Sequence, residues 1–123
     1  MKKTYFNKQN VKLTDPTYLN GEFELEYYIL TNKTDDEKNT YGVEIIKKYI
    51  DIYGNRITQS NIEEVITEKE NDIKSFVQKL FECMITPMCL NEVVIDFKNG
   101  LVIWKSNRLK TVAFCFKNCK IVL

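Results

Sequence analysis

The residues best suited to binding chemistry in this sequence include a group of closely spaced acids. Glu22, Glu24 and Glu26 alternate along one segment, and Asp35 and Asp36 follow in a polar stretch. Residues two apart share a face of a strand, so these carboxylates would form an acidic patch. Such a patch could meet a basic partner or imitate a phosphate backbone. An ordinary solvated surface is the simpler interpretation of the same pattern.

The second chemically distinctive group is a basic C-terminal segment. Residues 1–97 carry twelve Lys and Arg against seventeen Asp and Glu, whereas residues 98–123 carry six basic residues and no acid. This asymmetry is typical of an interacting tail. Lysines interleaved with aromatic residues could bind single-stranded nucleic acid by charge and stacking, although Phe114 and Phe116 also fit a core strand. The candidate binding residues are Lys105, Arg108, Lys110, Lys117 and Lys120.

Catalytic chemistry has little support in the sequence. There is no histidine, which removes His-based general base catalysis, Ser-His or Cys-His nucleophiles and imidazole metal ligands. The glycines are isolated, so there is no glycine-rich phosphate loop. The four cysteines lack the paired spacing of a tetrathiolate zinc site and are interpreted as buried, reduced thiols. We therefore expect no enzymatic activity, no cofactor and no bound metal.

The middle of the chain predicts a two-helix unit over residues 71–100. Apolar residues recur at helical spacing from Ile73 to Met84 and again from Leu90 to Phe97. Residues 67–70 have the form of a capping box for the first helix. Thr86-Pro87 would end that helix and start the second, because proline disfavours helical geometry in the residue before it.

The residues before and after this unit predict strands. Residues 4–13 could form an edge strand, and residues 22–31 alternate cleanly between an apolar and a polar face. Residues 41–53 favour a strand with a bulge at 45–46, with a helix as the rival, because β-branched residues are frequent there. Residues 62–66 fit either a short strand or one helical turn. Residues 101–123 would form two hairpins.

These elements predict one α+β domain over residues 1–123, in which the two-helix unit packs on one face of a small antiparallel sheet. The core would span residues 22–100, and the basic segment 101–123 would add strands from the other end of the chain. With 44% hydrophobic residues, the chain is long enough for one core.

Several short segments resemble a known family. They are residues 27–30 (Tyr-Tyr-Ile-Leu), residues 41–45, a helix ending in Ile-Thr-Pro at 85–87, and residues 90–96. The chain resembles, over about residues 22–99, a family of small uncharacterised proteins from clostridia and related Gram-positive bacteria, a domain of unknown function. The resemblance implies a cytoplasmic bacterial protein and carries over no catalytic residue. The basic segment departs from the family pattern.

The sequence thus predicts a small non-enzymatic cytoplasmic protein, regulatory or inhibitory, that binds a protein partner. The alternative is a nucleic-acid-binding accessory protein that uses the basic segment. Self-association as a homodimer is compatible with either. No apolar signal core and no window of about twenty apolar residues occurs, so we expect no membrane association.

Overall fold

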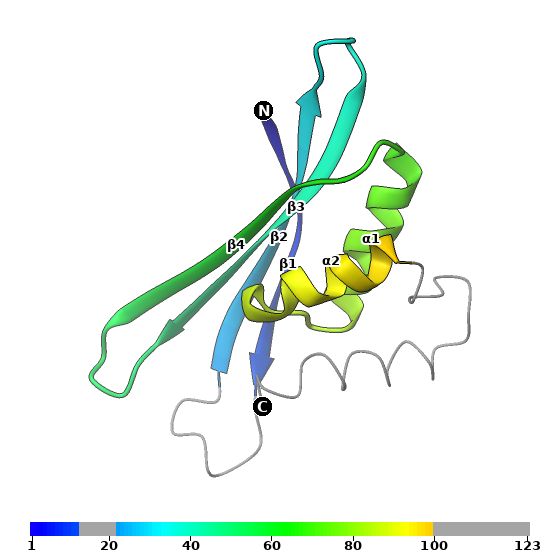
Figure 1. Cartoon of the computed structure of the whole chain (residues 1–123). Coiled ribbons are helices and arrows are strands. Elements are labelled where there is room, and N and C mark those ends of the chain that lie inside the picture. Colours follow the sequence, from blue (N-terminus) through cyan, green and yellow to red (C-terminus); the bar gives the residue numbers. More distant parts are fainter. Residues whose placement is uncertain (13–21, 100–123) are drawn as a thin grey trace.

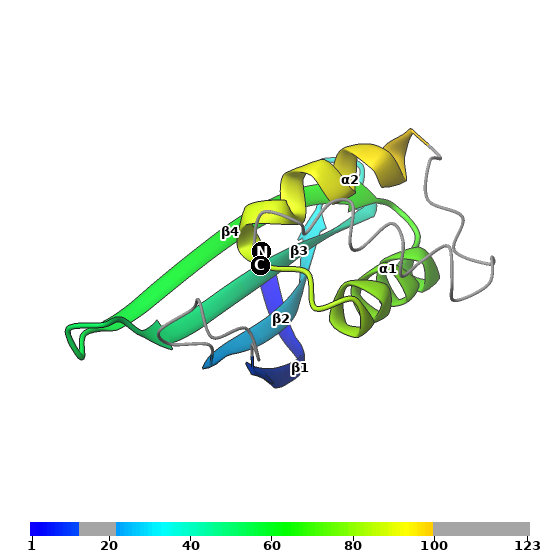
Figure 2. The same ribbon diagram turned by 90° about the horizontal axis from the view of Figure 1, so that it is seen from below.

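Two helices cover one face of a four-stranded antiparallel sheet (Figures 1 and 2). The computed structural model describes residues 1–12 and 22–99. The strands follow chain order across the sheet as β1 (Lys2–Lys12), β2 (Glu22–Lys33), β3 (Asn39–Ile50) and β4 (Arg56–Thr67). They are followed by helix α1 (Glu70–Glu82), the 3-10 turn η1 (Pro87–Cys89) and helix α2 (Leu90–Lys98). The predicted α+β class, with two helices on one face, is confirmed.

Alternation along β2 determines which side chains meet the helices. Leu25 and Tyr27 are fully buried in the core, whereas Glu24, Glu26 and Tyr28 have the opposite parity. We call the side of the sheet turned away from the helices the outer face. The strand predicted at residues 22–31 is confirmed, and so is the edge strand near the N-terminus, which pairs with β2 as β1.

The irregularity expected in the third strand lies elsewhere. β3 pairs with β2 without interruption from Asn39 to Lys48, so the bulge predicted at residues 45–46 is wrong. The change of phase in the sequence has another cause: Ile46 lies on the outer face, where it is only half-buried. Residues 62–66, left open between strand and helix, belong to β4.

The register of β4 shifts beside Gly42, between its pairs with Tyr41 and Val43. A Cβ atom at Gly42 would lie 2.1 Å from the carbonyl oxygen of Glu63 and 2.3 Å from that of Glu64. No side chain fits this distance, so glycine allows the backbone of β4 to cross close to β3.

The helices bury the stripes that their spacing predicted. Ile73, Phe76 and Leu80 of α1 are buried against the sheet, and Leu90 and Val93 of α2 join the same core. The predicted capping box does not form. β4 continues to Thr67, the N-cap is Lys69, and the Thr67 hydroxyl accepts a hydrogen bond from the Lys69 N–H.

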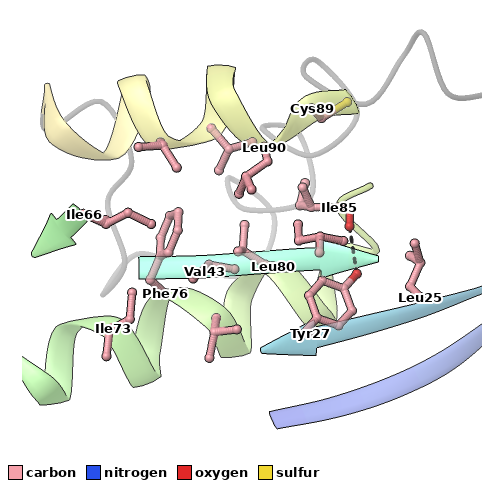
Figure 3. Close-up of a cluster of buried hydrophobic side chains, with 14 of the residues drawn as sticks. Leu25, Tyr27, Val43, Ile66, Ile73, Phe76, Leu80, Ile85, Cys89 and Leu90 are labelled. Atoms are coloured by element: carbon pink, nitrogen blue, oxygen red, sulfur yellow. Dashed lines mark hydrogen bonds between the residues drawn. The ribbon is translucent and has the colours of Figure 1, made fainter. Parts of the chain in front are cut away.

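One buried hydrogen bond ties the sheet to the segment between the helices (Figure 3). The Tyr27 hydroxyl donates to the carbonyl of Ile85 at 2.9 Å. Thr86 takes the predicted N-cap position before Pro87, although its hydroxyl makes no capping bond. The strands predicted in residues 101–123 lie outside the described residues.

Candidate functional site

The three glutamates predicted as a binding patch are each placed opposite a lysine on the outer face. The register pairs Glu22 with Lys12, Glu24 with Lys48 and Glu26 with Lys8. Opposite charges directly across an antiparallel ladder attract and stabilise the pairing of the strands. The glutamates of β2 therefore largely balance lysines of the sheet itself.

Glu26 lies at the centre of this arrangement and is almost buried. Its carboxylate accepts hydrogen bonds from the Lys48 ammonium at 2.9 Å and from the Tyr28 hydroxyl at 2.8 Å. Burial opposes ionisation of Glu26, but these bonds and the charge of Lys48 together favour the ionised form, and the pKa of the carboxyl is lowered. The same bond to Glu26, together with burial, raises the pKa of Tyr28 to about 12.

A second ion pair extends the cluster to β1. Lys3 pairs with the carboxylate of Glu44, and its ammonium lies 4.3 Å from the centre of the Tyr28 ring. Tyr5 packs edge-on against Tyr28 with ring centres 5.8 Å apart. We call Lys3, Tyr5, Glu26, Tyr28, Glu44 and Lys48 the outer-face cluster. Its carboxylates are nearly covered, so the parts that reach solvent are the lysine ammonium groups and the Tyr5 ring.

The two remaining predicted acids lie at a distance from the glutamates. Asp35 and Asp36 occupy the exposed turn between β2 and β3, where Thr34 and Lys38 hold the chain by backbone hydrogen bonding. A strand rises about 3.4 Å per residue, so Glu22 and Lys33 at the two ends of β2 are about 37 Å apart. The five acids are thus not brought together into one patch.

Three exposed apolar side chains lie close together in the chain at the other hairpin turn. Ile50, Ile52 and Tyr53 are 55%, 60% and 81% exposed. They lie at the tip of the β3–β4 hairpin, which projects beyond the helices (Figure 1). We call these three residues the hairpin tip. The Gly54-Asn55 dipeptide favours a turn here, but no binding surface was predicted at this position. The available signal was apolar residues directly beside a Gly-Asn turn, where polar residues are usual.

The hairpin tip is held by its own turn. The Asp51 carboxylate accepts hydrogen bonds from the backbone N–H of Asn55 at 2.8 Å and of Tyr53 at 2.9 Å. These bonds favour the ionised form and lower the pKa of Asp51. Gly54 has φ +82°, which suits glycine. The turn therefore presents Ile52 and Tyr53 in a defined conformation.

The remaining predicted site residues belong to the basic segment. Lys105, Arg108, Lys110, Lys117 and Lys120 lie outside the described residues. Within residues 1–12 and 22–99, no three Cys, Asp or Glu side chains are grouped so as to hold a metal ion. In the same part of the chain, no helix is long and apolar enough to cross a membrane.

The two described cysteines both lie at the core. Cys89 is a buried thiol, as predicted. Cys83 is half-buried at the end of α1 and is disulfide-bonded, so the prediction of four reduced thiols is wrong for this residue.

Comparison with known proteins identifies the family but no activity. Residues 2–99 match the model of a family of unknown function (DUF6514). The chain belongs to this family. No curated protein and no solved structure matches it.

Membership of DUF6514 confirms the expected domain of unknown function and extends it to include β1. The clostridial origin and the cytoplasmic location stay predictions. The DUF6514 match includes the outer-face cluster and the hairpin tip, and it ends before the basic segment 101–123. A role shared by the family is therefore to be sought first on the surfaces described above.

Proposed function

We propose that this protein is a non-enzymatic regulatory or inhibitory factor that binds a protein partner through the hairpin tip. The observation that supports this most directly is the exposure of Ile50, Ile52 and Tyr53 at one end of the sheet. Apolar side chains grouped on a projecting turn are not needed to cover the core, which the helices already do.

The hairpin tip has the residue types and the fixed backbone that are typical of residues anchoring a protein contact. Tyrosine is enriched among the residues that dominate binding energy, because a large ring buries much area with few rotatable bonds. A turn already fixed by Asp51 and Gly54 loses little conformational freedom on binding. Such an anchor would enter an apolar pocket on the partner.

The β2–β3 turn provides an internal contrast. Its residues Thr34–Lys38 are polar or charged and include Asp35 and Asp36. Both turns are exposed and both connect neighbouring strands, but this one has the composition usual for a solvated loop. We therefore place the protein contact at the β3–β4 turn.

The proposal can be tested by site-specific photo-crosslinking in cells that naturally produce the protein. A benzophenone amino acid replaces Tyr53 in one variant and Asp36 in the matched control. We expect a discrete protein adduct from position 53 and not from position 36. Equal adducts from both positions, or none from position 53, would contradict the proposal.

The captured partner then allows a quantitative test. Tyr53→Ala removes the anchor and is expected to weaken binding by about 2 kcal/mol, or roughly thirtyfold, as at other aromatic hot spots. Asp36→Ala is the control and should leave affinity unchanged. The nucleic-acid alternative rests on residues outside the described part of the chain and stays a prediction.

A further inference from the structure

The two edge strands of the sheet differ in how well they are protected. β1 carries Lys2, Lys3, Lys8 and Lys12 and has a register shift between Tyr5 and Asn7. Lysines and bulges are the usual devices that keep a sheet edge from pairing with another strand. β4, by contrast, has no charged residue and no proline from Ile57 to Ile62, and its register is regular there.

Two hydrogen bonds show which backbone groups point away from the sheet. The Ile62 N–H donates to the Asn61 side chain, and on the opposite edge the Lys8 N–H donates to Asn7. Antiparallel strands direct alternate residues outward. Lys8 lies opposite Glu26, Glu26 opposite Ile46, and Ile46 opposite Ser60. The bond at Lys8 therefore indicates that the backbone groups of Ser60 point outward, and the bond at Ile62 indicates the same for the next residue of this set. The residues of β4 with outward backbone groups are Arg56, Thr58, Ser60 and Ile62.

We propose that a second copy of this chain pairs with β4 in an antiparallel manner, about a two-fold axis at Ser60. An antiparallel pair of identical edges has its axis perpendicular to the sheet, and residues opposite each other must face the same side. Even-numbered residues of β4 then pair with even-numbered residues of the second copy. Their outward N–H and C=O groups are the ones that the pairing would satisfy.

Charge selects the register. With the axis at Ser60, Arg56 of each copy lies opposite Glu64 of the other, which places two attractive pairs symmetrically at the ends of the contact. With the axis at Gln59, Arg56 would lie opposite Ile62 instead. Ser60 meets its own copy at the axis, where the two residues would exchange both backbone hydrogen bonds.

Within residues 1–12 and 22–99, no element pairs with the outer edge of β4. α2 and η1 pack on the helix-covered face of β4, where the Asn61 amide donates to the carbonyl of Pro87 at 3.1 Å. The first half of β4 runs beyond the helices (Figure 1). The paired segment would span residues 56–64 and would end where the register of β4 with β3 shifts, so the hairpin tip lies outside it. The dimer therefore goes beyond the proposed function and is tested separately from it.

The test is the mass of the protein in solution, measured by sedimentation equilibrium across a concentration series. The full chain is expected to form a dimer. Arg56→Glu and Glu64→Arg each place like charges opposite one another twice per dimer, so each should weaken dimerisation about tenfold or more. The double variant Arg56→Glu/Glu64→Arg restores both pairs in reverse and should recover the dimer. Lys2→Glu on the β1 edge is the matched control and should behave as wild type.

A backbone variant supplies an independent measure. Ser60→Pro removes an outward N–H while leaving the bonds of β4 to β3 in place, so it should give a folded monomer. Circular dichroism checks that the fold is retained. A wild-type protein that stays monomeric at the highest concentration would overturn the proposal. A dimer that resists both single charge reversals would overturn it as well.

Discussion

Tyr27 and Tyr28 are neighbours in the chain, yet they are stabilised in different ways on opposite faces of the sheet. Tyr27 is fully buried, and its hydroxyl donates to Ile85, which is 58 positions further along the chain. The hydroxyl of Tyr28 donates to Glu26, two residues away on the same strand. The covered face thus depends on the close packing of distant segments, and the outer face on charges from adjacent strands.

This difference bears on where a partner can bind. Because the glutamates of β2 face lysines of the neighbouring strands, the outer face has little unbalanced charge to offer. Separating these pairs would cost energy, because each charged group would lose its partner. The side chains of the hairpin tip form no ion pair with the described residues, and this favours the tip as the contact surface.

The largest expected difference in stability between the two faces comes from truncating a side chain in the core. Phe76→Ala removes a fully buried ring that packs 4.7 Å from the ring of Phe97, so a cavity would remain. We expect a loss of about 3–5 kcal/mol in the free energy of unfolding. Tyr5→Ala, the aromatic control on the outer face, removes a ring that is 53% exposed and should cost about 1 kcal/mol or less. Urea unfolding measures both, and equal losses would contradict the division between the faces.

The adjacent tyrosines allow a closer test. Tyr27→Phe leaves the buried carbonyl of Ile85 without this donor and should destabilise by about 1–3 kcal/mol. Tyr28→Phe leaves Glu26 with its bond to Lys48, so the cost should be about 1 kcal/mol or less. If Tyr28→Phe proves the more damaging, the outer-face cluster contributes more than its partial exposure suggests.

Periodicity in the sequence was sufficient to predict the faces of β2 and the buried stripe of α1. Both depend on spacing within one element, which a sequence displays directly. The pairing of Glu26 with Lys48 could not be predicted in this way, because it depends on the register between two strands. The supposed acidic patch failed to assemble for a similar reason: the length of β2 separates Glu22 from Asp35.

The positions at which strands end and helices begin could not be predicted from sequence patterns either. Thr67 and Glu70 fit a capping box, but Thr67 is the last residue of β4, so tertiary pairing determined where the helix begins. The sequence around Gly42 did not predict that the backbone of β4 lies so close to it, because a close approach depends on two segments. The hairpin tip was visible only as a turn with unusually apolar neighbours.

The third prediction concerns the ion pair at the centre of the outer face. Glu26→Gln removes the charge that Lys48 contacts, and should cost about 1 kcal/mol near neutral pH. The folded-state pKa of Glu26 lies below its ordinary value of 4.5. The stabilisation is therefore present above that value and is lost as the pH falls through the folded pKa. Unfolding curves of the two proteins should converge in acid. Lys48→Met, combined with Glu26→Gln in a double-mutant cycle, measures the pair itself.

The smallest effect concerns the titration of Tyr28 at high pH. The pKa of Tyr28 is raised from 10.0 to about 12. The folded state therefore holds this proton more tightly, and the associated stabilisation is present below pH 10 and is lost as the pH rises through about 12. Ultraviolet difference spectra should show a late phenolate step that Tyr28→Phe abolishes. Glu26→Gln should shift the same step towards the ordinary value, because the neutral amide no longer favours the protonated phenol. A step unmoved by Glu26→Gln would show that burial, rather than the neighbouring charge, controls this hydroxyl.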